Sequence, residues 1–568
     1  MRLAGHALLG LLAASLLAAP LLAIAQPRPD LDGVSVREAA AVPQTNDEHP
    51  IRIARNPADG ALYVLATSNP GGTGATTSTI YRLDAQAGET FDLVPVLTHN
   101  AHGTPRAVGM AFGPDGSFYL VGNAEAGDDR TRLVVRRGTP VGTSWRWATV
   151  ATSEPYRLSR TWFDHRANAV AVTPDGSTLI VNSGARTDHG EMYGGVREEG
   201  LTAILLQIPA AARDLVLPND REALRADGYL FAEGIRNTAD LAFAPNGDLF
   251  GPENAGDRDD SEELNWLREG RHYGFPWRIG TSTTPMQFPG YDPAADPFVS
   301  PARNLDNEAD TGWYFSDDPT FPAPPDGVAF TEPIPNVGPD ADRYRDPVTG
   351  ALLDASDTGT AAGTFTAHRS PLGLVFDADS ALAAPLTGSA FVLSFNGPGD
   401  SLLDRMGGGG NDLLALDLEA GPGGYTLSAT LVASGFDHPV DAAMGDGVLY
   451  VIEYGNWFGP GGSRSVQAVT LPRRATASEP LPDAPDLALA VAPNPARDAV
   501  TLRVTLDRPV HARLDVLDVL GRTVLRAPLS ATTGTQVLPV SVRGFPSGVY
   551  VARLVTEDGV ATRSFTVQ

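Results

Sequence analysis

A phrase of apolar and polar residues recurs between residues 51 and 451. Each copy holds a short apolar run, a turn such as Pro-Asp-Gly or Pro-Asn-Gly, and a second run in which apolar residues alternate. The copies span 51–65, 107–121, 169–181, 239–250, 372–393 and 440–451. Alternation with period two predicts a strand with one buried face, and Asp-Gly or Asn-Gly accepts the positive φ of a tight turn. Each copy therefore predicts a β-hairpin.

The spacing of the copies predicts how the hairpins are organised. The turn residues Asp59, Asp115, Asp175 and Asn246 lie 56, 60 and 71 residues apart, which suits one four-stranded sheet per copy. The next turn residue, Asp379, lies 133 residues further on, twice that interval, so we expect a long insertion at about 281–365. Six copies in series favour an all-β, six-bladed β-propeller over 26–472 rather than a sandwich or a solenoid.

The insertion is rich in Pro, Asp and Gly and contains the aromatic run Trp313, Tyr314 and Phe315. Its length and these aromatic side chains indicate a lid or a pocket rim.

The composition changes after Leu471. Residues 473–486 are rich in Pro, Ala and acidic residues, as is typical of a linker. Residues 487–568 then show short alternating runs, which predict a small Ig-like β-sandwich. The runs are 499–506, 512–519, 523–528, 535–542, 549–555 and 561–567.

The first 25 residues have the pattern of a secretory signal peptide. Arg2 supplies a positive start, residues 8–22 are almost entirely apolar, and Ala23-Ile24-Ala25 forms a small-x-small cleavage pattern. No other stretch approaches the ~18 apolar residues of a membrane span, so we expect no transmembrane segment. The pattern predicts export through the periplasm.

Charge and cysteine content exclude several classes of function. The formal net charge is −26, and all 42 basic residues are arginine. Nucleic acid and anionic membranes require a basic footprint, so neither is an expected partner. The chain has no cysteine, which excludes disulfides, thiolate metal sites and cysteine nucleophiles.

Six carboxylates crowd the stretch 253–263. They are Glu253, Asp257, Asp259, Asp260, Glu262 and Glu263. Oxygen ligands on a loop are what Ca²⁺ prefers, although the spacing differs from that of an EF-hand. From composition alone, a solvated acidic loop is a better interpretation than a metal site.

The surroundings of this loop resemble a known family. In order, the chain has Arg236-Asn237, then Glu253-Asn-Ala-Gly256, Glu262-Glu-Leu-Asn265 and Tyr273-Gly-Phe-Pro276. This series resembles the soluble glucose and sorbosone dehydrogenases that depend on pyrroloquinoline quinone (PQQ). The resemblance implies a secreted enzyme that oxidises a sugar hydroxyl by hydride transfer to the quinone and passes electrons to an external acceptor.

A second motif, Phe163-Asp-His165, precedes a strand and a Pro-Asp turn as it does in that family. The resemblance implies that His165 is the general base that removes the proton of the sugar hydroxyl and that Asp164 orients it. An imidazole with a pKa near 6.5 can accept a proton at neutral pH. A lone loop histidine that only makes hydrogen bonds is the alternative.

The resemblance also implies cofactor contacts. Arg236 and Asn237 would face the quinone carbonyls, where a cation and an amide donor stabilise developing negative charge. An ion pair with an acidic loop is the alternative for Arg236. His368, in a His-x-x-Pro-Leu-Gly-Leu segment, and Arg405, in a loop rich in Gly and Asp, are further cofactor-binding candidates.

Two calcium sites follow from the same resemblance. Backbone oxygens of Asn254, Ala255 and Gly256 would hold one ion beneath the quinone. Glu263 and Tyr273 would hold a second, structural ion.

Two departures from the family keep other functions open. The family's lysine near the cofactor has no counterpart in this lysine-free chain, and 102–106, before the second repeat, lacks the family's glutamine. A non-catalytic propeller that binds a glycan or a protein is the main alternative. A calcium-dependent lactonase is a further one, and it would need Asn, Asp and Glu side chains converging on the central channel.

The C-terminal module has its own resemblance. Residues 492–495 (Ala-Pro-Asn-Pro), 514–522 and 545–550 resemble, in order, the type A sorting domain of the type IX secretion system. A generic Ig-like binding module is the alternative. The resemblance implies that the secretion machinery is a partner and that the protein is secreted or held at the cell surface.

Overall fold

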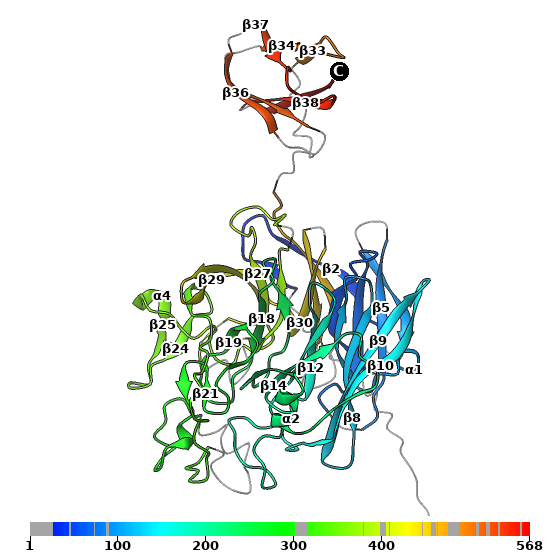
Figure 1. Cartoon of the computed structure of the whole chain (residues 1–568). Coiled ribbons are helices and arrows are strands. Elements are labelled where there is room, and N and C mark those ends of the chain that lie inside the picture. Colours follow the sequence, from blue (N-terminus) through cyan, green and yellow to red (C-terminus); the bar gives the residue numbers. More distant parts are fainter. Residues whose placement is uncertain are drawn as a thin grey trace, which may run out of the picture. The chain divides into compact units, whose positions relative to one another are not determined.

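The computed structural model describes residues 26–568 apart from short gaps. The gaps are 45–46, 73, 87–89, 301–314, 379, 398–404, 408, 446, 456–461, 463, 475–487, 507–509, 519–522, 532–533 and 557–558. The chain divides into two units, Met1–Arg473 and Arg474–Gln568 (Figure 1). The predicted signal peptide and all but the first two residues of the predicted linker lie outside the described residues.

Every copy of the repeated phrase forms an antiparallel strand pair, as the sequence predicts. The pairs are β3 (Glu48–Arg55) with β4 (Leu62–Ser68), β7 (Ala107–Phe112) with β8 (Phe118–Glu125), β12 (Ala167–Val172) with β13 (Thr178–Ser183), β17 (Ala242–Phe243) with β18 (Leu249–Glu253), β26 (Pro371–Phe376) with β27 (Ala390–Ser394), and β30 (Pro439–Gly445) with β31 (Val448–Glu453). We call the first strand of each pair an inner strand.

The turn chemistry behind these hairpins is visible in the first four of them. The side-chain oxygens of Asp59, Asp115, Asp175 and Asn246 each accept the backbone N–H two residues further on, at 2.9 to 3.1 Å. The glycine after each has a φ between 74° and 90°. A short polar side chain followed by glycine therefore closes the turn without a steric penalty.

Further strands widen each pair into a sheet. They are β5 (Ser78–Ala85) and β6 (Phe91–Thr98) on the first; β9 (Arg130–Val141), β10 (Ser144–Ser153), β11 (Tyr156–Arg157) and β15 (Leu215–Leu217) on the second; β14 (Ile204–Pro209), β16 (Leu230–Glu233) and β20 (Arg271–His272) on the third; β19 (Glu263–Leu267) on the fourth; β28 (Asp412–Gly421), β29 (Gly424–Ser434), β1 (Arg28–Pro29) and β23 (Asn336–Pro339) on the fifth; and β32 (Ser465–Thr470) and β2 (Ser35–Ala41) on the last.

The last sheet joins the two ends of the first unit. Its order is β2-β32-β31-β30, so β2, from the N-terminal end of the unit, pairs with β32, from its C-terminal end (Figure 1). Inner strands of successive sheets also touch, since β3 contacts β7 and β30, β7 contacts β12, and β30 contacts β26. The sheets therefore surround a common centre.

The centre is held by one arginine. From β3, the Arg52 guanidinium donates to the backbone carbonyls of Val108 (3.1 Å), Asn168 (2.7 Å) and Ala239 (2.6 Å), which belong to the second, third and fourth repeats. A guanidinium has five N–H donors in a fixed fork, which lets one side chain bridge several backbones. Arg52 thus ties four repeats together at their inner edge.

Two carboxylates complete the centre. Asp240 accepts from the backbone N–H of Leu374 in β26 (2.8 Å), and Asp441 in β30 accepts from Ile53 in β3 (2.9 Å). Burial and the charge of Asp240 raise the pKa of Asp441 to about 8, although Arg52 opposes the rise. The centre therefore holds two carboxylates beside one guanidinium.

This centre makes stability depend on pH. Since the pKa of Asp441 rises from 3.8 to about 8 on folding, its contribution is fully present below pH 3.8 and is lost as pH rises toward 8. Between pH 5 and pH 8, we expect the melting temperature of Asp441→Asn to fall by less than that of the parent. A difference of 1 kcal/mol in stability corresponds to about 2–4 °C in melting temperature. Circular dichroism melts measure this, with Asp417→Asn on an exposed strand position as the control. Parallel pH profiles for parent and Asp441→Asn would contradict the assignment.

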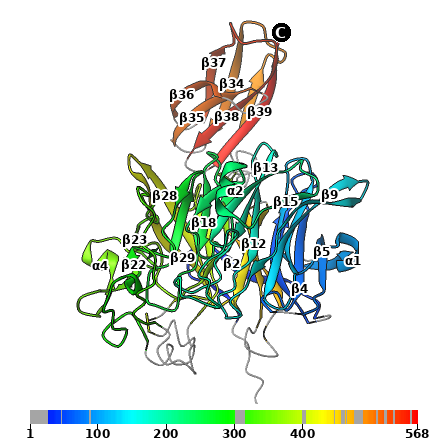
Figure 2. The same ribbon diagram turned by 60° about the horizontal axis from the view of Figure 1, so that its bottom comes forward.

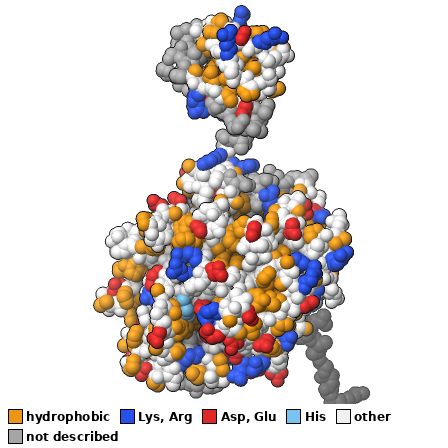
Figure 3. Space-filling model, in the orientation of Figure 1, with side chains coloured by type: hydrophobic (Ala, Val, Ile, Leu, Met, Phe, Trp, Pro, Cys, Tyr) orange, Lys and Arg blue, Asp and Glu red, His pale blue; other side chains and the backbone are white. Residues whose placement is uncertain are grey.

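Short elements fill the connections of the first unit. They are the strand pairs β21 (Arg278–Ile279) with β22 (Ser282–Thr283) and β24 (Arg343–Arg345) with β25 (Leu352–Asp354), the helices α1 (His99–His102), α2 (Arg221–Ala226) and α4 (Ala355–Thr358), and the 3₁₀ turn η1 (Pro285–Gln287). Among the described residues, no helix is long and apolar enough to cross a membrane. Figure 3 shows arginines and acidic side chains interspersed over the visible face of this unit.

The long insertion packs onto the third sheet's loops. Phe315 is 2% exposed and stacks on His189 with 4.5 Å between ring centroids. It shares an apolar cluster with Phe163 and Met286. Trp313 and Tyr314 lie outside the described residues.

The second unit consists of two antiparallel sheets. One is β33 (Ala488–Ala492), β34 (Ala499–Leu506) and β37 (Gly534–Ser541); the other is β36 (Thr523–Ala531), β35 (Val510–Leu517), β38 (Gly548–Thr556) and β39 (Gly559–Val567) (Figure 2). Apolar side chains of both sheets form one core. All six strands predicted here exist, with ends shifted by a few residues, whereas β33 was not predicted.

One buried carboxylate anchors the larger sheet of this unit. Asp515 in β35 is buried and accepts from Arg526 on β36 (2.8 Å) and Arg553 on β38 (2.9 Å). Although burial opposes the change, these two arginines lower the pKa of Asp515. The ion pairs cross-link three neighbouring strands.

Candidate functional site

Strained residues gather where the inner strands begin. The residue immediately before an inner strand has φ 54° at Asp47, 37° at Arg106, 51° at Arg166, 53° at Ser370 and 55° at His438. Residues other than glycine seldom adopt positive φ, and such strain clusters at functional sites. We call this end of the first unit the mouth.

His165 lies at the mouth, next to Arg166. Its backbone N–H donates to the carbonyl of Ala185 (3.0 Å), and its Nδ1 lies 3.1 Å from the same oxygen. Because a carbonyl only accepts, Nδ1 carries the proton and Nε2 carries the lone pair. Burial and the charge of Arg236 lower the pKa of His165 to about 3. The imidazole is therefore neutral and able to accept a proton through Nε2.

Asp164 makes different contacts from those that the resemblance implies. Its carboxylate accepts from the backbone N–H of Ser159 (2.7 Å) and Arg160 (2.8 Å) and from the Ser159 hydroxyl (3.0 Å). The Ala185 carbonyl, not Asp164, contacts Nδ1 of His165. Asp164 thus fixes the loop that carries His165, and Ala185 orients the ring.

Arg236 is buried and tightly bonded. Its Nε donates to the Asp188 carbonyl (2.8 Å), Nη2 pairs with the Asp188 carboxylate (2.9 Å), and Nη1 donates to the Asn254 carbonyl (3.0 Å). Although burial opposes it, His189 and Arg236 lower the pKa of Asp188. The arginine is therefore in an ion pair, and Asp188 is a site residue that sequence reasoning missed.

A chain of amides crosses the mouth. The side-chain amide of Asn182 donates to that of Asn168 (2.7 Å), and the amide of Asn168 donates to that of Asn237 (2.8 Å). The Nδ2 of Asn237 lies 3.4 Å from the Oδ1 of Asn254. Asn254 in turn donates to the carbonyl of Pro371 (2.8 Å). This chain connects the third, fourth and fifth repeats and brings Asn237 and Asn254 together. Asn168 was also missed, although it is a polar residue where the second repeat has Val108.

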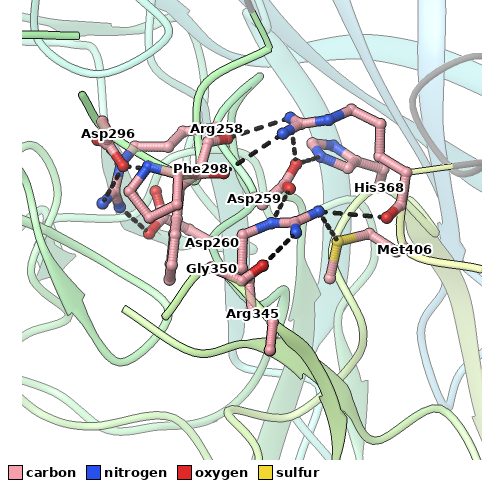
Figure 4. Close-up of polar contacts among 12 residues, drawn as sticks. Arg258, Asp259, Asp260, Asp296, Phe298, Arg345, Gly350, His368 and Met406 are labelled. Carbon is pink, nitrogen blue, oxygen red and sulfur yellow. Dashed lines mark hydrogen bonds and ion pairs between the residues drawn. The ribbon is translucent and has the colours of Figure 1, made fainter. Parts of the chain in front are cut away.

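His368 and Arg405 meet at a different carboxylate. Asp259 is fully buried and lies 2.8 Å from His368 Nε2 and 2.6 Å from Arg345 Nε (Figure 4). Its carboxylate also lies 2.9 Å from Arg405 Nη1. Although burial opposes it, His368 and Arg405 lower the pKa of Asp259. Both predicted cofactor-binding side chains therefore contact an acidic residue of the 253–263 loop.

The remaining acidic residues of this loop are buried. Glu253 and Glu263 are direct partners across β18 and β19, and Asn265 donates to both, at 3.3 and 2.7 Å. Burial raises the pKa of Glu253 to about 7 and that of Glu262 to about 8, and burial together with Glu253 raises that of Glu263. Burial therefore favours the protonated form of these glutamates, while Asp260 of the same loop pairs with Arg258.

The residues of the first implied calcium site do not fit a metal ion. The Asn254 carbonyl accepts from Arg236, and a Cβ on Gly256 would lie 2.7 Å from the Asp188 carboxylate. Ala255 packs in an apolar cluster with Phe275. The positive charge at this position comes from Arg236.

The second implied calcium site fits no better. The Tyr273 hydroxyl donates to the Trp266 carbonyl and accepts from the Arg268 N–H, while Glu263 accepts from Asn265 and Gly280. Within the described part of the chain, no group of three or more His, Asp or Glu side chains is arranged to hold a metal.

These contacts predict that calcium removal has little effect. We expect the thermal midpoint of the purified protein to change by less than about 1 °C after dialysis against EDTA. A loss of about 1 kcal/mol in stability would shift the midpoint by roughly 2–4 °C, so the expected loss is smaller than that. Differential scanning calorimetry with and without added Ca²⁺ measures this. A midpoint that rises with Ca²⁺ concentration would contradict it.

Comparison with known proteins identifies the C-terminal unit. Residues 490–568 match the family described as the secretion system C-terminal sorting domain, as the sequence motifs predict. The domain marks the protein for export, to the cell surface or into the medium. No curated protein matches the chain.

Solved structures similar to the chain include quinone-dependent sugar dehydrogenases. The PQQ-bound aldose sugar dehydrogenase of Streptomyces coelicolor is 17% identical with a TM-score of 0.42, covering 77% of this chain and 98% of its own. The PQQ domain of the pyranose dehydrogenase of Coprinopsis cinerea is 12% identical with a TM-score of 0.45, covering 78% and 98%. A glucose dehydrogenase is 14% identical with a TM-score of 0.43, covering 78% and 99%.

Proposed function

We propose that the first unit is a six-bladed β-propeller that oxidises a sugar hydroxyl with PQQ as the acceptor of hydride. One observation carries the proposal: a neutral His165 imidazole, with its lone pair on Nε2, lies beside a buried arginine at the mouth. A general base and a fixed positive charge are the two groups that removal of a hydroxyl proton and of a hydride require.

The mouth offers hydrogen-bond donors to an anionic cofactor such as PQQ, which carries three carboxylates. Arg369 and Arg464 are buried in mouth loops and pair with Asp412 and Asp47. Their Nε atoms have no hydrogen-bond partner within the described part of the chain. Arg236 and Asn237 would face the quinone, and when bound it would supply the hydride acceptor. Asp259 would hold His368 and Arg405 in place at the edge of the same site.

Three residues of the chain have separate roles in this reaction. His165 takes the hydroxyl proton on Nε2, and the Ala185 carbonyl keeps the opposite nitrogen protonated. Asp164 holds the loop of His165 through Ser159 and Arg160. Asp188 fixes the guanidinium of Arg236, so that its charge is in place before substrate binds.

The low pKa of His165 predicts an unusual pH profile. Because a base must be unprotonated to act, the acid limb of kcat/KM reports the pKa of the free enzyme's base. We expect no loss of kcat/KM from pH 8 down to about pH 5, with the fall centred near pH 3, the value set by burial and Arg236. An ordinary histidine would give a midpoint near pH 6.5. Dye-reduction assays across this range, in buffers where the protein stays folded, decide between the two.

A glycan- or protein-binding propeller without catalysis is the second candidate. The observation in its favour is that Arg236 already bonds through Nε, Nη1 and Nη2 to the protein itself. Reduction of an artificial electron acceptor, dependent on both added PQQ and an aldose, supports the dehydrogenase. Binding of the aldose with no reduction in a PQQ-supplied sample supports the binding module.

A further inference from the structure

An arginine-lined pocket opens beside the loop of His165. It has a volume of about 200 Å³, and its walls come from the ends of the first, second and third sheets. Its charged lining residues are Arg106, Arg130, Arg160, Arg166, Glu125 and Asp128. Arg166 directly follows His165 in the chain, so one loop contributes both to the pocket and to the candidate base.

The charge of this pocket opposes that of the whole protein. Four arginines face two carboxylates here, whereas the chain carries a formal net charge of −26. Two of the four are deeply placed, because Arg106 is 3% exposed and Arg166 is 9% exposed. Buried charges are normally paired, so an excess of buried guanidinium groups indicates a missing anion.

The contacts of the two buried arginines leave this excess uncompensated. Arg106 donates to the carbonyls of Asn69 (2.5 Å) and Gly74 (2.8 Å), and Arg166 donates to that of Gly72 (2.9 Å). Among the described residues, the buried Nε of Arg166 has no hydrogen-bond partner. A single carboxylate, that of Glu125, lies 3.5 Å from Arg106, and it is more than half exposed.

Electrostatics and strain agree with this geometry. Burial and the charge of Arg166 lower the pKa of Arg106, and Glu125 offsets this only in part. Both arginines have positive φ, so the backbone at the pocket is strained. Clustering these guanidinium groups costs free energy, and an anion bound between them would lower that cost.

We propose that this pocket binds the anionic substituent of an acidic saccharide, a carboxylate or a sulfate ester. Arginine forks match planar and tetrahedral oxyanions. Since pockets for whole cofactors measure roughly 300–1,000 Å³, this one suits a substituent or a single sugar unit. The saccharide rests on the proposed function, whereas the anion rests on the pocket itself. A uronic acid or a sulfated hexose would then present a hydroxyl toward His165.

The test is calorimetric titration of the full exported chain, without PQQ, with glucuronate, glucose 6-sulfate and glucose. We expect either acidic sugar, or both, to bind about tenfold or more tightly than glucose, and salt to weaken this binding. Preference for glucuronate identifies a carboxylate, and preference for glucose 6-sulfate identifies a sulfate ester. Equal binding of all three sugars, or none, would overturn the proposal.

Variants separate the pocket from the rest of the mouth. Arg130→Gln with Arg160→Gln changes the two outer arginines, and we expect about tenfold weaker binding of the acidic sugar. Arg166→Gln removes the buried donor and is expected to do the same, provided that its melt matches that of the parent. Arg146→Gln, on an exposed position of β10, removes one positive charge outside the pocket, as Arg166→Gln does inside it, and is expected to have no effect.

These outcomes are independent of catalysis. Binding of acidic sugar without sugar-dependent reduction keeps the pocket and contradicts the dehydrogenase. Weakened PQQ binding in the Arg130/Arg160 variant, with acidic-sugar binding unchanged, would instead assign the pocket to the cofactor and overturn the proposal.

Discussion

Replacing His165 with alanine is expected to abolish sugar-dependent reduction while the fold is kept. General-base catalysis contributes roughly 10²–10⁴-fold, so kcat should fall by at least about a hundredfold. Since His165 Nδ1 bonds only a backbone carbonyl, the substitution removes no ion pair. Stopped-flow reduction of the quinone on mixing with an aldose measures the loss.

The control for this variant is His99→Ala. His99 lies in α1 and contacts Ser78, so it tests the loss of a loop histidine outside the proposed site. We expect its rate to match the parent. A His165→Ala protein that reduces the quinone at the parental rate would remove His165 from the mechanism, and a variant that fails to bind PQQ would give it a binding role instead.

Arg52→Leu is expected to destabilise the first unit more than any surface substitution. The change leaves three buried carbonyls without their donor and leaves Asp240 and Asp441 without a nearby cation. Leaving a buried acceptor without its hydrogen-bond donor costs about 1–3 kcal/mol, so losing the donor to three carbonyls should cost several kcal/mol. Urea unfolding followed by tryptophan fluorescence measures it.

Arg55→Leu is the matched control, because Arg55 ends the same strand and its Nε donates to Gly60 in an exposed turn. We expect a change within about 0.5 kcal/mol. If Arg52→Leu unfolds at the same urea concentration as Arg55→Leu, Arg52 does not hold the centre.

The hairpins were predictable from sequence because their signals are local. A turn residue such as Asp115 accepts the N–H of Ser117, two residues away, and the flanking apolar alternation sets which face is buried. The role of Arg52 was not predictable, because its acceptors lie 56, 116 and 187 residues away. Sequence therefore predicts the repeats better than the contacts that join them.

The candidate site shows the same division. Local motifs pointed to His165, Arg236 and Asn237, and all three lie at the mouth. Calcium at the acidic loop 253–263 was implied by the family resemblance, whereas the structure pairs two of the loop's carboxylates with arginines. Arg258, which pairs with Asp260, is local, but the partners of Asp259 are distant. Arg345 and Arg405, which neutralise Asp259, are 86 and 146 residues away.

The orientation of His165 also depended on distant residues. Its hydrogen-bond partner, Ala185, lies 20 residues further on and offers a backbone carbonyl, which no side-chain motif records. Asp188 could be recognised as a site residue only from the structure, which pairs its carboxylate with Arg236.

The proposed function is tested most directly by titrating the exported chain with PQQ. Absorbance is followed during the titration and again after addition of neutral and acidic aldoses. We expect stoichiometric binding and aldose-dependent reduction of the bound quinone, with reduction lost in His165→Ala. No binding of micromolar PQQ by the folded protein would contradict the quinoprotein account and leave a binding propeller in its place.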